Sequence, residues 1–249
     1  FNYETFALGG FLLSNSKKLI VASGIANMYA RDPAASVMGC NSLNALYGGR
    51  FVLGLGVSHA PLVSDVRGHE YKKPVATMRK YLEDMDLAWT ALGGAPPEKQ
   101  TMLAALGPNM SALAAEKTMG TFPYNITPAQ VALSRAAMGP EGKIVCEQKV
   151  CLTTDPVMAR AAARGALAPY LPLPNYFKNW FRLGFNESDL ENGGSDRLMD
   201  AMVVWGSSEQ IAETLSKYLE NGADQVVIQP IRPDGQPGID WEALEALAK

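Results

Sequence analysis

The sequence has few of the residues and patterns that mark several large classes of protein. Only two histidines and three cysteines occur in 249 residues, and no histidine is spaced with a cysteine as a ligand pair, so we expect no metal site. No apolar run approaches the roughly 20 residues of a bilayer span, and no secretory signal opens the chain. The net charge of −3 gives no attraction for nucleic acid or an anionic membrane, so neither is an expected partner.

The cysteines Cys40, Cys146 and Cys151 are an odd number and form no CxxC pair. We therefore expect them to be buried, reduced thiols in a cytoplasmic protein. A hydrophobic share of 47% with 19% charged residues is ordinary for a globular chain and argues against intrinsic disorder. A chain of this length can bury a sizeable core, either as one barrel or as two small domains.

Short β-type runs alternate with longer segments of helical period, which predicts an α/β fold with a parallel sheet. Asp-Pro or Thr-Pro pairs at 32–33, 127–128 and 155–156 are typical of helix starts. A Gly/Pro-rich loop is expected at 93–97. Helices are expected within 3–13, 75–89, 108–118, 128–138 and 208–220, and six strands within 19–24, 50–56, 102–106, 120–126, 144–153 and 225–229.

No strand is expected between residues 167 and 205, a stretch rich in aromatic residues and proline. We interpret it as helices and loops inserted before the last βα unit of a single domain. Such an insertion suits a lid over a site, and it equally suits a plain surface insertion.

The second predicted strand ends in the run Gly54-Leu55-Gly56-Val57-Ser58-His59. Glycines at a strand end let a flat ligand approach the backbone, and residues just beyond a barrel strand face the catalytic mouth. His59 could exchange a proton with a substrate, donate a hydrogen bond to a cofactor, or merely bond to the loop backbone. A GxGxxG dinucleotide motif is excluded, because His59 stands where the third glycine is needed.

Two further strand ends are candidates for ligand contact. Ser23-Gly24-Ile25 follows the first strand, where a glycine beside a β-branched residue permits a bulge. Leu106-Gly107-Pro108-Asn109 joins a strand to a helix, so its bare N–H groups could hold a phosphate without any charged side chain. An ordinary βα turn is the alternative for the second segment.

The order of these motifs resembles the luciferase-like monooxygenase superfamily, especially its coenzyme F420-dependent oxidoreductase branch. The resemblance covers essentially the whole chain and is most specific in "GRFVLGLGVSHAP" at 49–61. It continues in "LAALGPNM" at 103–110, and in "GSSEQIA" at 206–212 followed by "GADQVV" at 222–227.

The resemblance implies a (β/α)₈ barrel with a cofactor ring against the carboxyl ends of its strands, held mainly by backbone contacts. Ser23, Gly24 and Ile25 would form a bulge that supports the ring face, where the family often has a non-proline cis peptide. Val57, Ser58 and His59 would line the ring edge, although some relatives carry an acidic residue at the position of His59. The phosphate side would meet the turn formed by Ala105, Leu106, Gly107, Pro108 and Asn109.

The implied activity is hydride transfer between coenzyme F420 and a small organic substrate, in a cytoplasmic homodimer. An FMN-dependent luciferase-like monooxygenase and a non-catalytic flavin-binding protein are the alternatives. The family's first two strands would precede Phe1, where this sequence begins. Either that segment has been removed, or the barrel is a reduced one whose edges something must cover.

Overall fold

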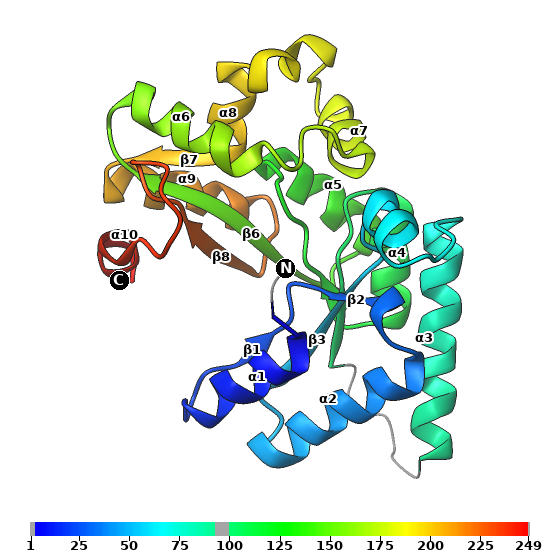
Figure 1. The fold of residues 1–249 in the computed structure, drawn as a ribbon. Helices are drawn as coiled ribbons and strands as arrows, with labels where there is room; N and C mark the ends of the chain where they lie inside the picture. The colour runs from blue at the N-terminus through cyan, green and yellow to red at the C-terminus, as the bar shows by residue number, and fades with distance from the viewer. Residues whose placement is uncertain (1–2, 93–99, 249) are drawn as a thin grey trace. The chain divides into compact units, whose positions relative to one another are not determined.

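The computed structural model describes residues 3–92 and 100–248 and shows an α/β protein with parallel strands (Figure 1). The chain divides into two compact units. Unit 1 comprises Phe1–Ala105 and Asn109–Phe122, and unit 2 comprises Leu106–Pro108 and Pro123–Lys249. The loop predicted at 93–97 lies outside the described residues.

Unit 1 is a parallel sheet with helices packed against it. Strands β1 (Val21–Ala22) and β2 (Ala26–Asn27) both pair with β3 (Phe51–Gly56), which pairs in turn with β4 (Thr101–Leu103), and β4 pairs with β5 (Gly120–Thr121). The helices are α1 (Thr5–Ser14), α2 (Pro33–Tyr47), α3 (Pro74–Ala91) and α4 (Pro108–Lys117), with short turns η1 (Met28–Ala30) and η2 (Pro61–Val66).

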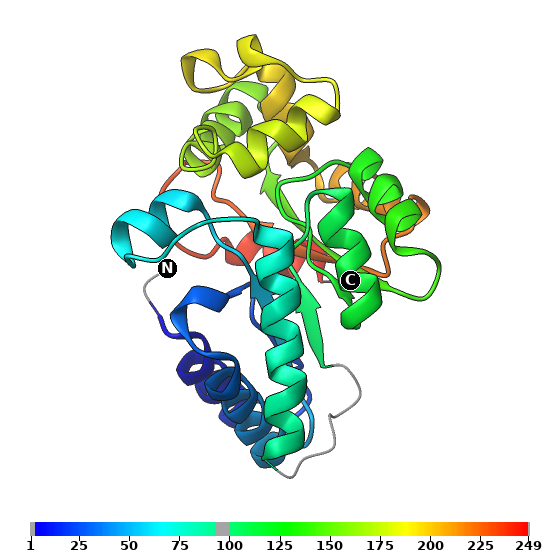
Figure 2. The same cartoon turned by 90° about the vertical axis from the view of Figure 1, so that its right-hand side faces the viewer.

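The helices of unit 1 begin and pack as their sequences dictate. The Asp32 carboxylate accepts a 2.8 Å hydrogen bond from the Ala35 N–H, which caps α2 ahead of Pro33. Helix α3 packs against α2, and its long axis is clearest in Figure 2. Trp89 on α3 donates to Asn41 Oδ1 on α2 at 3.0 Å, so the indole is both buried and hydrogen-bonded.

Unit 2 is organised around β6 (Lys143–Leu152), the longest strand. Strand β7 (Val203–Gly206) pairs with β6 at Lys149–Leu152, and β8 (Gln225–Pro230) pairs with β6 at Val145–Val150, both in parallel. The helices are α5 (Pro128–Met138), α6 (Pro156–Leu167), α7 (Pro174–Arg182), α8 (Asp196–Met202), α9 (Ser208–Glu220) and α10 (Trp241–Leu247). Short turns η3 (Glu187–Asp189) and η4 (Glu191–Gly193) lie between α7 and α8.

The described residues contain eight strands, so the prediction of six was too low. The two-residue β2 was missed because it is separated from β1 by only three residues. Strand β7 was missed because it follows α8 directly, without the turn residues that usually announce a strand. Residues 167–205 are mainly helical, as predicted, but their last three residues belong to β7 and pair with β6.

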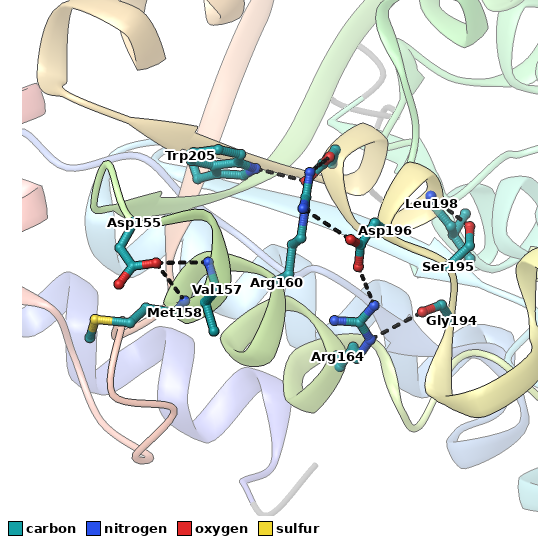
Figure 3. A network of polar contacts seen from close by, with 11 residues as sticks. Asp155, Val157, Met158, Arg160, Arg164, Gly194, Ser195, Asp196, Leu198 and Trp205 are labelled. Atoms are coloured by element: carbon teal, nitrogen blue, oxygen red, sulfur yellow. Dashed lines mark hydrogen bonds and ion pairs between the residues drawn. The ribbon is translucent and has the colours of Figure 1, made fainter.

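A network of charged side chains joins α6 to α8 (Figure 3). Arg160 binds both carboxylate oxygens of Asp200, at 3.0 and 2.7 Å, and also contacts Asp196 at 2.9 Å. Asp196 also accepts from Arg164, and the Trp205 indole donates to Asp200 at 3.0 Å. These side chains are partly exposed, so the network fixes the local geometry more than it stabilises the fold.

The three thiols are free and buried, which confirms that part of the expectation. Burial raises the pKa of Cys40 to about 11, of Cys146 to about 12 and of Cys151 to about 11. They therefore stay protonated and unreactive at neutral pH. Across the described residues, no helix combines the length and apolar character needed to cross a bilayer.

Candidate active site

The segment between β1 and β2 is a bulge. Ala22 pairs with Val52 and Ala26 pairs with Leu55, so four steps on one strand match three on the other (26 − 22 against 55 − 52). One extra residue is thereby inserted opposite β3. The peptide bond between Gly24 and Ile25, inside this segment, is cis. The bulge and the cis peptide are as the family resemblance implies, while the ring-supporting role remains a prediction.

Ser23 fastens the bulge to β3. Its hydroxyl donates to the Gly54 carbonyl at 2.9 Å and accepts from the Gly54 N–H at 2.9 Å. The Ser23 backbone N–H also donates to the Val52 carbonyl at 3.1 Å. Because Ser23 is buried, these bonds form away from competing water and hold the bulge in one place.

The glycines of β3 make room for this bulge. A Cβ on Gly54 would lie 1.9 Å from the Ser23 carbonyl oxygen, and one on Gly56 would lie 2.6 Å from Ile25 Cδ1. The space that we expected a flat ligand to use is therefore filled by the chain itself, and that interpretation of the two glycines was wrong. Gly24 differs, because it is exposed and a Cβ there would meet no atom within 4 Å.

Val57, Ser58 and His59 continue the chain beyond β3, and all three are half-buried. Ser58 has a left-handed backbone with φ of 58°, and its carbonyl accepts a 3.3 Å hydrogen bond from the Tyr71 hydroxyl. The His59 carbonyl accepts from the Val63 N–H at 3.0 Å, at the start of the π turn η2. This tip of β3 is thus held by its own loop.

The His59 imidazole is neutral at pH 7. Burial lowers its pKa from the ordinary 6.5, because a charged imidazolium loses solvation there. A neutral ring has one nitrogen that donates and one that accepts, so it can take a proton from a substrate or give a hydrogen bond.

The turn after β4 begins beside the tip of β3. The Ala104 N–H donates to the Leu55 carbonyl at 2.8 Å, and Ala105 is buried. Unit 1 therefore brings the segments of Ser23, Val57 and Ala105 to neighbouring carboxyl ends of its strands. Asn109 is exposed and also belongs to unit 1.

Leu106, Gly107 and Pro108 group with unit 2, and a charged side chain lies beside them. Arg182 Nη2 is 3.4 Å from the Leu106 carbonyl oxygen and 3.7 Å from where a Cβ on Gly107 would lie. The sequence predicts that the N–H groups of this turn could hold a phosphate by themselves, and it gives no sign of the charged side chain that lies beside them. Nothing in the local sequence could have shown this, because Arg182 is 75 residues further along the chain (182 − 107).

Sequence reasoning also missed a charged pair on β6, formed by the buried Lys149 and the half-buried Glu147 with a contact of 3.3 Å. A signal for it was present in the sequence. Two opposite charges stand two residues apart in a strand that is otherwise largely apolar, so both side chains lie on one face of the sheet.

The fold and these strand-end segments fit one family of oxidoreductases. The sequence model of the luciferase-like monooxygenase family matches residues 1–225, and the chain belongs to this family. The resemblance seen in the motifs is thereby confirmed, as is the expectation of an enzyme of this class.

Individual relatives differ in the cofactor that they are named for. A Mycobacterium tuberculosis protein named as a coenzyme F420-dependent oxidoreductase is 28% identical, over 92% of this chain and 78% of its own length. Coenzyme F420-dependent tetrahydromethanopterin reductase from Methanopyrus kandleri has a TM-score of 0.78 at 17% identity, covering 100% of this chain and 86% of its own. The oxygenating constituent of 3,6-diketocamphane monooxygenase from Pseudomonas putida, in complex with FMN, has a TM-score of 0.72 at 14% identity, covering 99% and 83%.

Proposed function

We propose that this protein transfers a hydride between coenzyme F420 and a small organic substrate. The observation that carries the proposal is the bulge at Ser23, Gly24 and Ile25, which is fastened to β3 and leaves the Gly24 backbone bare at the strand ends. A flat tricyclic ring needs such a rigid surface without side chains. The name of the Mycobacterium tuberculosis relative supports F420 as the cofactor.

The residues at the strand ends suit the ring in shape and polarity. Gly24 offers open backbone, and Ile25 packs on Gly56 and presents an apolar edge. Val57 and Ser58 would border the ring, as the family resemblance implies. When bound, the deazaflavin supplies the hydride-carrying C5 position, and the chain supplies placement and proton transfer.

His59 would act on the substrate oxygen. Hydride transfer between an alcohol and a carbonyl moves a proton at that oxygen, and a neutral imidazole can accept it. Because burial lowers the His59 pKa, the ring is in its base form at neutral pH. In this proposal the His59 imidazole contacts the substrate; the alternative is that it only hydrogen-bonds to its own loop.

The phosphate side of the cofactor would meet the turn from Ala105 to Asn109. This turn leads directly from β4 into α4, so its amides are the unsatisfied donors of a helix start. In unit 2, the Arg182 guanidinium beside Gly107 adds a positive charge to that turn. The helix-start amides from Asn109 onward belong to unit 1 and Arg182 belongs to unit 2, and each by itself favours an anionic group on a ligand.

FMN is the second candidate, since a related fold is known in complex with FMN. The two cofactors share a tricyclic ring and a phosphate, so the contacts above serve either. Purified protein titrated with each cofactor, followed by fluorescence quenching, separates them. We expect micromolar binding of F420 and weaker binding of FMN; the reverse order would assign an FMN enzyme, and no micromolar binding of either would refute the proposal.

A Gly24→Ala variant tests the surface that carries the proposal. The new Cβ meets no protein atom within 4 Å, so we expect the melting temperature to stay close to that of the wild type. Cofactor affinity should fall by about tenfold or more, because the methyl group stands where the ring would lie. Unchanged affinity would move the ring away from this bulge.

A further inference from the structure

A buried polar cluster in unit 2 plays no part in the function proposed above. Lys149 on β6 is only 1% exposed. Its Nζ lies 2.6 Å from Asn125 Oδ1, 3.3 Å from Glu147 Oε1 and 3.8 Å from the centre of the Tyr124 ring. The ammonium group thus has its three directions filled by an amide oxygen, a carboxylate and an aromatic face.

Two polar atoms of this cluster have no hydrogen-bond partner among the described residues. They are Asn125 Nδ2 and Glu147 Oε2, and both atoms are buried, while the Glu147 carboxylate takes its other contacts from Lys149 and from the Asn125 backbone N–H. Buried donors and acceptors are almost always satisfied, because leaving one unpaired forfeits its solvation. The pair therefore indicates a group that completes the cluster.

Asn125 cannot find a partner for its Nδ2 group by flipping its side-chain amide. Its amide oxygen must face the Lys149 ammonium, which only donates, so the Nδ2 donor must point elsewhere. Its backbone is also held, because its carbonyl accepts a 3.0 Å hydrogen bond from the Trp180 indole and its φ is +53°. Asparagine is among the few residues that tolerate this left-handed conformation.

Aromatic side chains border the cluster and become more exposed away from it. The hydroxyls of Tyr124 and Tyr170 lie 3.0 Å apart, and Tyr124 donates to Gln229 Oε1 at 3.2 Å. Tyr170 packs edge-on against Tyr176, with ring centres 5.0 Å apart. Tyr124 and Tyr170 are half-buried and Gln229 is exposed, so this side of the cluster leads toward solvent.

The charge balance selects the kind of group that fits. Lys149 and Glu147 neutralise one another, so their fields largely cancel and neither an anion nor a cation gains a net attraction that would offset its loss of solvation. The unsatisfied atoms are one donor and one acceptor. A hydroxyl group can accept from Asn125 and donate to Glu147 at the same time, while a carbon skeleton can lie against the tyrosine rings.

We propose that Asn125, Glu147 and Lys149 form a binding site for the hydroxyl group of a neutral organic ligand. Lys149 acts here as a positioning residue, since it orients the amide and the carboxylate that contact the ligand. The site lies within unit 2 and can be tested without any cofactor, so its failure would leave the proposed function standing.

The first experiment compares ligands that share one ring. The full chain is titrated by calorimetry with cyclohexanol, methoxycyclohexane, cyclohexanecarboxylate and protonated cyclohexylamine. We expect cyclohexanol to bind saturably, and the other three to bind about tenfold more weakly or not at all. Methoxycyclohexane is the sharpest comparison, because its ether oxygen can accept from Asn125 but has no proton for Glu147.

The second experiment changes the protein. In Glu147→Gln, an amide donor can replace the free acceptor, and in Asn125→Asp, an acceptor replaces the free donor. Each substitution should weaken the binding of cyclohexanol by about tenfold. Lys143→Gln is the control on the same strand, because Lys143 is exposed and pairs with Asp224 instead. The fold of each variant is checked by circular dichroism.

Three results would overturn the site. They are equal binding of all four ring compounds, tighter binding of either charged compound, and cyclohexanol affinity that both folded variants retain. An absence of saturable cyclohexanol binding to the wild-type chain counts against it as well. The ligand comparison needs no variant, so it decides the question even where a substitution unfolds the protein.

Discussion

Replacing Gly54 by alanine should damage the fold far more than one methyl group suggests. The new Cβ would lie 1.9 Å from the Ser23 carbonyl oxygen, whereas real Cβ atoms essentially never approach below 3.0 Å. The two backbones must therefore separate by at least 1.1 Å (3.0 − 1.9). The obstacle is a main-chain oxygen, so shortening the Ser23 side chain would not relieve it.

The cost can be estimated from what the separation breaks. Two hydrogen bonds of 2.9 Å join the Ser23 hydroxyl to Gly54, and losing both costs about 2 kcal/mol. Overpacking of a buried strand adds about 1–3 kcal/mol. A total of about 3–5 kcal/mol corresponds to a fall in melting temperature of roughly 6–20 °C for a chain of this size.

Thermal unfolding followed by circular dichroism measures this effect, with Gly165→Ala as the matched control. Gly165 lies inside helix α6, and a Cβ there meets nothing within 4 Å. The same chemical change should therefore leave stability unchanged or raise it by up to about 1 kcal/mol, because alanine is the better helix former. If Gly54→Ala melts within 2 °C of the wild type, roughly the effect of 1 kcal/mol, the close approach of the bulge to β3 is refuted.

The double variant Gly56→Ala with Ile25→Ala separates the two glycines of β3. A Cβ on Gly56 would meet Ile25 Cδ1 at 2.6 Å and Cγ1 at 2.8 Å, and both atoms are absent from alanine. We therefore expect Ile25→Ala to recover part of the stability lost in Gly56→Ala. The coupling between the two sites should be about 1 kcal/mol or more. Simple additivity would show that the two side chains do not compete for this space.

Three further predictions concern His59, Trp180 and the cysteine thiols. His59→Ala should lower turnover by about tenfold or more with little change in stability at pH 7, measured by steady-state kinetics and melting. Burial lowers the His59 pKa, so as pH falls the unfolded chain binds a proton at this histidine before the folded chain does. Below pH 6.5 the free energy of unfolding of the wild type should therefore fall relative to that of His59→Ala, and near neutral pH this loss should disappear. Trp180→Phe removes the donor to the Asn125 carbonyl and should cost about 1–3 kcal/mol in urea unfolding. The thiols Cys40, Cys146 and Cys151 should resist a thiol reagent until the protein unfolds, and rapid labelling of the native chain would contradict their burial.

The parts of the fold that local patterns determine could be predicted from the sequence. Helix α9 has the predicted bounds, because Ser207 and Gln210 form a capping box at its start and its apolar period is regular. Strand β3 was predicted to within one residue, since it is a continuous apolar run that is buried on both faces. Such signals need no knowledge of distant partners.

The arrangement of the candidate sites depended on residues far apart in the sequence. Asn125 and Lys149 are 24 residues apart, and Gly107 and Arg182 are 75 apart (182 − 107), so no spacing rule connects them. Opposite charges two residues apart on an apolar strand do indicate a shared face. They do not indicate which other side chains complete the cluster, because that depends on tertiary packing.

The glycines of β3 show where such reasoning stops. A glycine in a strand indicates that something approaches the backbone closely, but a ligand and a neighbouring strand leave the same mark in the sequence. Ser23 packs against Gly54 and Ile25 packs against Gly56, so neither glycine of β3 is open to a ligand on that side. The backbone that stays open is that of Gly24. Because the bulge packs closely on the glycines of β3, the backbone of Gly24 is left exposed at the strand ends. A bulky residue at position 54 should therefore impair cofactor binding through the displaced bulge, without touching the cofactor itself.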